Sequence, residues 1–78
     1  MPRAYVLIEA PFEKITSVRN ALGSLGNCKA LVEALWPGEL VVHIEGNDPE
    51  SLHDGLTRQL PAIDGVTRMT VWSITNRP

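Results

Sequence analysis

Cysteine is nearly missing from this chain of 78 residues, because Cys28 is its only one. An internal disulfide is therefore excluded. A zinc site is disfavoured, since zinc takes several Cys or His ligands and the two histidines have no metal-ligand spacing. A domain this short buries a marginal core, and small domains usually need a staple or a partner. With the disulfide and the metal set aside, we expect a partner subunit.

Basic clusters and long apolar runs are also lacking. The formal net charge is -2, and the seven Lys and Arg residues are scattered along the chain. This argues against nucleic-acid binding by this chain alone, which normally needs a clustered positive surface. No stretch approaches the length of a membrane span, and the first residues do not resemble a signal peptide. We therefore expect a cytoplasmic protein with no membrane contact.

Catalytic patterns are equally scarce. The serines lie in no nucleophile-elbow sequence, and there is no glycine-rich phosphate loop. His43 would need an orienting partner to act as a base, and none is evident, so we interpret it as a half-buried strand residue. His53 is interpreted as a solvated helix residue, and Cys28 as a small buried hydrophobe. The sequence predicts no enzyme, no cofactor and no metal.

Hydrophobic periodicity is what the sequence does contain. Apolar runs predict strands at residues 4–9, 28–35, 40–45 and 66–75, the first of them buried on both faces. One apolar stripe (Phe12, Ile15, Val18, Leu22 and Leu25) predicts a helix of about three turns. Asp48 and Pro49 are typical of an N-cap and first helical position, and we expect that second helix to end near Leu60.

The predicted order of elements is βαββαβ, in one domain over residues 1–78. Two right-handed strand–helix–strand units give an α+β ferredoxin-like fold, with a four-stranded antiparallel sheet and both helices on one face. Apolar residues alternate on both faces of the predicted strands, so we expect the uncovered face to meet another sheet. Trp72 is expected to be buried and Trp36 to lie at an interface.

Three segments resemble the effector-binding domain of the Lrp/AsnC regulators, also called the RAM domain. They are residues 3–8, residues 40–48 and residues 63–68, the last with a Gly-Val-x-Arg turn into the final strand. The resemblance spans nearly the whole chain, which begins directly on the first strand and so looks like a stand-alone RAM domain. It implies a dimeric α/β plait that assembles further, to an octamer or decamer. It also implies a small effector of amino-acid type, and modulation of transcription through full-length Lrp/AsnC regulators without direct DNA binding.

The same resemblance places the ligand site at a turn and on the last strand. The residues at those positions are Trp36, Pro37, Gly38, Glu39, Arg68, Met69 and Val71. Glu39 keeps the acid of the family's Gly-x-Tyr-Asp turn, but Trp36 replaces its glycine. Met69 and Val71 replace two threonines, so we expect weak affinity for polar amino acids.

Two other functions remain as alternatives. One is a cofactor-free dimeric enzyme similar to the small ferredoxin-like monooxygenases, for which Tyr5, His43 and Trp72 are the available residues. The other is a purely structural oligomerisation domain.

Overall fold

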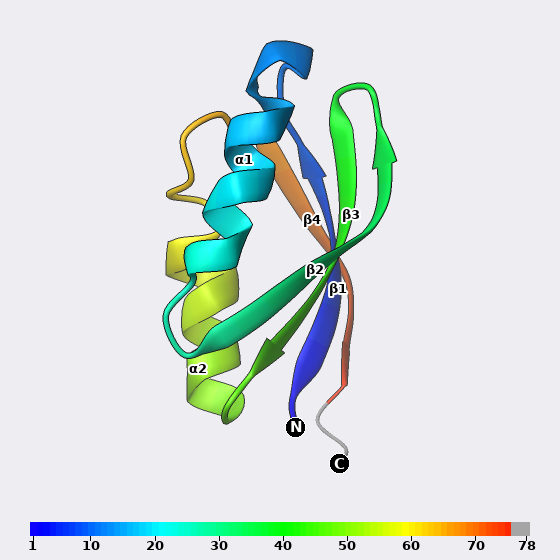
Figure 1. The fold of residues 1–78 in the computed structure, drawn as a ribbon. Helices are drawn as coiled ribbons and strands as arrows, with labels where there is room; N and C mark the ends of the chain where they lie inside the picture. Colours follow the sequence, from blue (N-terminus) through cyan, green and yellow to red (C-terminus); the bar gives the residue numbers. More distant parts are fainter. Residues whose placement is uncertain (76–78) are drawn as a thin grey trace.

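The computed structural model describes residues 1–75 and has the expected order of elements (Figure 1). The four strands and two helices alternate as βαββαβ. They are β1 (Arg3–Glu9), α1 (Ile15–Ala21), β2 (Cys28–Trp36), β3 (Glu39–Gly46), α2 (Pro49–Asp54) and β4 (Arg68–Thr75).

The strands form one antiparallel sheet in the order β2-β3-β1-β4. Figure 1 shows α1 and α2 in a single layer against one face of this sheet. The ferredoxin-like α+β prediction is therefore confirmed. β1 and β3 lie in the centre, and β2 and β4 are the edge strands.

The core lies between the sheet and the helices. Alternate residues of the central strands are fully buried there, among them Val6, Ile8, Leu40, Val42 and Ile44. The expectation that the first strand is buried on both faces was wrong, because only every second residue of β1 is buried. Helices cover one face alone, so the other set of side chains remains accessible.

The first helical region is shorter and less regular than predicted. Tight 3-10 turns at Phe12–Lys14 and Leu22–Ser24 flank α1. Ile15 and Val18 face the core, but Phe12 is 73% exposed, because it lies in the turn before the helix axis is established. Asn27 then takes a positive φ of 57°, a conformation that Asn tolerates better than most residues.

The second helical region begins as predicted. Asp48 caps α2, accepting a hydrogen bond from the Ser51 N–H at 2.7 Å, and Pro49 follows it. The helix then widens into a π-helical stretch, Gly55–Gln59, closed by a bond from Leu60 N–H to Gly55 O of 2.8 Å. At Gly55 a Cβ would lie 2.9 Å from Cys28 Sγ, so glycine allows the helix to pass close to β2.

The last strand begins at Arg68, two residues later than predicted. Gly65 has a φ of 103°, and the Thr67 N–H donates to Glu9 O at 2.9 Å before regular pairing starts. The prediction that Trp72 is buried was wrong, since it is 57% exposed. Trp72 lies on an edge strand where the register with β1 shifts by one residue, between Tyr5/Ser73 and Val6/Val71.

Candidate functional site

The sheet face opposite the helices carries two largely apolar rows across its middle, in which five of the eight side chains are apolar and none is Asp, Glu, Lys or Arg. Strand register defines them, because directly paired residues share a face. One row runs Leu31, His43, Tyr5, Ser73, and the next runs Ala34, Val41, Leu7, Thr70. We call these eight residues the open face.

Side chains of the open face are partly accessible despite their apolar character. Leu31 is 54% exposed and Tyr5 is 42% exposed, while Val41 is nearly buried between its neighbours. The rings of Tyr5 and His43 lie 4.9 Å apart between centroids, tilted by 36°. His43 is half-buried, as predicted, and its Nδ1 lies 4.0 Å from Glu45 Oε1.

Charged residues occupy the rows at both ends of this face. One end row contains Lys29, Glu45, Arg3 and Thr75, and the other contains Trp36, Glu39, Glu9 and Arg68. The first row carries one more positive than negative charge, and the second carries one more negative than positive. An apolar centre with polar margins is the usual anatomy of a protein interface.

The predicted ligand residues divide between the two faces of the sheet. Trp36, Glu39 and Arg68 share the end row on the open side, where Arg68 Nε lies 3.6 Å from Glu9 Oε2. Met69 and Val71 pair with Ile8 and Val6, which places them on the helix side of the sheet. Met69 packs against the core, whereas Val71 is exposed.

Pro37 and Gly38 form the tight turn between β2 and β3. Gly38 has a φ of 82°, which favours glycine, and its carbonyl accepts a hydrogen bond from the Ala10 N–H at 3.0 Å. Trp36 and Glu39 pair across the base of this turn. The structure therefore places the four turn residues and Arg68 at the same end of the sheet, with β1 between them, and does not join them to Met69 and Val71 in one cavity.

A hollow of about 220 Å³ adjoins this turn. Its lining comes from the turn and from the start of the first helical region: Phe12, Ile15, Leu35, Trp36 and Pro37. Phe12, Ile15 and Leu35 were not among the predicted ligand residues. The exposed apolar side chains of Phe12 and Leu35 were not foreseeable, because both fall within runs that are typical of core segments.

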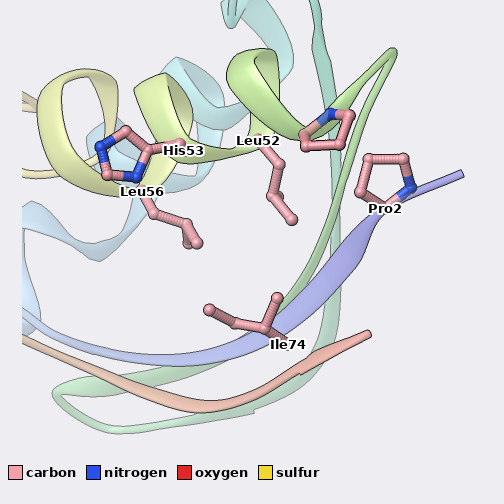
Figure 2. Close-up of a pocket in the computed structure, with 6 residues that line it drawn as sticks. Pro2, Leu52, His53, Leu56 and Ile74 are labelled. Atoms are coloured by element: carbon pink, nitrogen blue, oxygen red, sulfur yellow. The ribbon is translucent and has the colours of Figure 1, made fainter. Parts of the chain in front are cut away.

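A second apolar hollow, of about 210 Å³, lies beneath α2 (Figure 2). Leu52 and Leu56 point from the helix toward the sheet, Ile74 rises from β4, and Pro2 forms one side. His53 and Pro49 complete the lining. A third, more polar hollow at the start of β2 includes Asn27, Cys28 and Lys29.

Cys28 is a packed thiol rather than an activated one. Burial, then the nearby carboxylates of Asp54 and Asp48, raise the pKa of this thiol. Its Sγ donates to Ser51 O at 3.1 Å. A raised pKa keeps the group in the unreactive thiol form at neutral pH.

Within residues 1–75, no three His, Cys, Asp or Glu side chains gather closely enough to hold a metal ion. The described residues also contain no helix that is long and apolar enough to cross a membrane.

Comparisons with known proteins identify a fold but not a family. No family model matches this chain, and no curated protein does. The crystal structure of TTHA0845 from Thermus thermophilus is similar over 100% of this chain and 96% of its own, with a TM-score of 0.75 and 24% sequence identity. At that identity, the similarity establishes the shared fold alone.

Proposed function

We propose that this chain is a non-enzymatic assembly module that pairs with a second copy through the open face and binds a small effector. This is the function that the Lrp/AsnC resemblance implies. The observation that carries it is the pair of apolar rows, Leu31 to Ser73 and Ala34 to Thr70, left uncovered on a four-stranded sheet. An apolar sheet face of this kind is stabilised when another sheet covers it.

Charge supports a second copy as the occupant. The two end rows have opposite excess charge, so a two-fold axis lying across the strands would bring the Lys29 and Arg3 end over the partner's Glu9 and Glu39 end. Exposed ion pairs contribute little to affinity but set orientation. The free chain exposes 4794 Å² of surface, which is ample for an interface of standard size, about 800 Å² per partner.

The effector site of this proposal is the hollow beside the Pro37–Gly38 turn. Its walls are apolar, and Glu39, which does not line the hollow, pairs with Trp36 at the base of the same turn, where its carboxylate could meet an ammonium group. This chemistry favours an amine or amino acid with an apolar side chain over a polar one, because four of the five lining side chains have no hydrogen-bonding group. Co-assembly with full-length regulators would use the same open face.

The enzyme alternative gains no support from the placement of its residues. Tyr5 and His43 lie on the open face, and Trp72 lies at the register shift of an edge strand. A cofactor-free monooxygenase needs polar groups in a cleft between sheet and helices, and among residues 1–75 no polar side chain is buried there.

The test is native mass spectrometry and sedimentation at micromolar concentration, with Leu31→Lys and Asn20→Lys compared. Both substitutions add one positive charge at an exposed position, but Asn20 lies on α1, away from the open face. Leu31→Lys should lower the mass of the assembly, and Asn20→Lys should leave it unchanged. A folded wild-type monomer under these conditions would refute self-assembly.

Ligand binding is tested separately by calorimetry across the amino acids, with Trp36→Ala and Glu39→Gln. Binding of an apolar amino acid that both variants weaken supports the effector site. Assembly without any bound ligand would leave the purely structural oligomerisation domain as the function.

A further inference from the structure

The outer edge of β4 is open to pairing. β4 is the last strand in the sheet order, and among residues 1–75 only β1 pairs with it. Alternate backbone N–H and C=O groups along Arg68–Thr75 therefore point away from the sheet. Such an edge is a template for another strand unless charge, proline or a covering element blocks it.

The two edge strands differ in how they are protected. Both contain a register shift, but β2 also carries Lys29 and Glu33. In β4 the seven residues from Met69 to Thr75 include no charge, no proline and no glycine. β-Branched and aromatic residues dominate this segment, which favours strand pairing.

The helix side of β4 offers space as well as backbone groups. Ile74 pairs with Ala4 and so faces the helices, yet it is 62% exposed, because the hollow beneath α2 lies over it (Figure 2). A strand added beside β4 would present every second side chain to this side of the sheet. Backbone bonds with apolar pockets for alternate side chains are the usual mode of strand addition.

We propose that the occupant is β4 of a second copy, running antiparallel and extending the sheet. β4 of the second copy is a neutral strand, and it would bring apolar side chains to the hollow beside Ile74 of the first copy. Antiparallel pairing also keeps the two Arg68 side chains apart. Along a strand of this length their separation is roughly 24 Å, beyond the screening length in physiological salt.

This interface is independent of the open face. The open face buries side chains on the surface away from the helices, whereas β4 pairing uses an edge. If both interfaces form, the assembly is larger than a dimer. A different substitution then disrupts each interface.

The test uses Ile74→Lys, with Asn20→Lys as the matched control and Leu31→Lys as the variant of the open face. Ile74→Thr, which keeps strand propensity, covers the case in which the lysine variant folds poorly. Hydrogen exchange at the β4 amides that point away from β1 is measured beside sedimentation, and circular dichroism checks the fold.

Ile74→Lys should halve the mass of the assembly and speed exchange at those amides by about tenfold or more relative to wild type. Asn20→Lys should change neither. Wild-type amides that exchange as fast as those of Ile74→Lys would overturn the proposal. Slow exchange of these β4 amides at dilutions where the chain is a monomer would also overturn the proposal, since the chain itself would then be protecting them. A mass that responds to Leu31→Lys but not to Ile74→Lys would support the open face and overturn pairing through β4.

Discussion

Gly46→Ala tests a close approach of β3 to α2. A Cβ on Gly46 would lie 2.5 Å from Leu52 N and 2.9 Å from Leu52 Cα, both in the backbone of α2. The strand cannot easily withdraw, because the Gly46 N–H donates to Pro2 O at 3.0 Å. Relief therefore requires α2 to shift on the core. Forcing an extra methyl into a packed site typically costs about 1–3 kcal/mol, and we expect that loss in the free energy of unfolding.

Gly23→Ala is the matched control for this prediction. The same methyl group added there meets no atom within 4 Å. Because glycine is a poor helix former, this variant should be neutral or gain up to about 1 kcal/mol. Urea denaturation followed by circular dichroism, at one protein concentration for all variants, measures both. Equal midpoints for the two variants would show that α2 does not approach β3 as closely as described.

Three further variants or reactions follow from local contacts. Asp48→Ala should lower the urea midpoint at pH 7, because the N–H of Ser51 donates to Asp48 and holds the pKa of that carboxyl below its usual range. Since the folded-state pKa is lowered, the stabilisation is complete above the unfolded pKa of about 3.9 and is lost as pH falls through the folded value. The difference in urea midpoint between Asp48→Ala and wild type should therefore become smaller in acid. A difference that stays constant with pH would contradict a stabilising role for the ionised cap. Burial raises the pKa of the Cys28 thiol, so Cys28 should react with iodoacetamide more slowly in the native protein than in urea at pH 8. Equal rates in the two conditions would show that the thiol is not packed in the native protein. Gln59→Glu should lower the free energy of unfolding by about 1 kcal/mol, because the amide that donates to Gly26 O at 2.9 Å becomes an acceptor; an unchanged urea midpoint would exclude this bond as a stabilising contact.

The fold was predictable because its elements have clear local signals. Alternating apolar residues, the Asp48-Pro49 helix start and the glycine turn at Gly65 act within a few positions, so a sequence window contains them. Which set of alternating residues meets the helices was not predictable. That choice depends on packing across the whole sheet, and the structure assigns it to Val6, Val42 and their row partners.

Side chains at the margins of the fold were the least predictable. Trp72 and Phe12 have the apolar character of core residues, yet one lies on an edge strand and the other in a turn. The ligand residues Met69 and Val71 were placed beside Glu39 by resemblance alone. Strand pairing determines instead which face each one occupies, and the pairing of Met69 with Ile8 and of Val71 with Val6 is a contact between opposite ends of the chain that no local pattern contains.

The order of strands also has a kinetic consequence. β2 and β3 form a hairpin closed by a two-residue turn, whereas β1 meets β4 only after nearly the whole chain has been traversed. Closing a loop about thirty times longer costs about 3 kcal/mol more in chain entropy. The hairpin is therefore available early in folding, and β4 docks late. Until β4 docks, one edge of β1 is open to pairing with any neutral strand nearby. Docking of β4 therefore completes the monomer and also ends the period in which a folding chain can mispair.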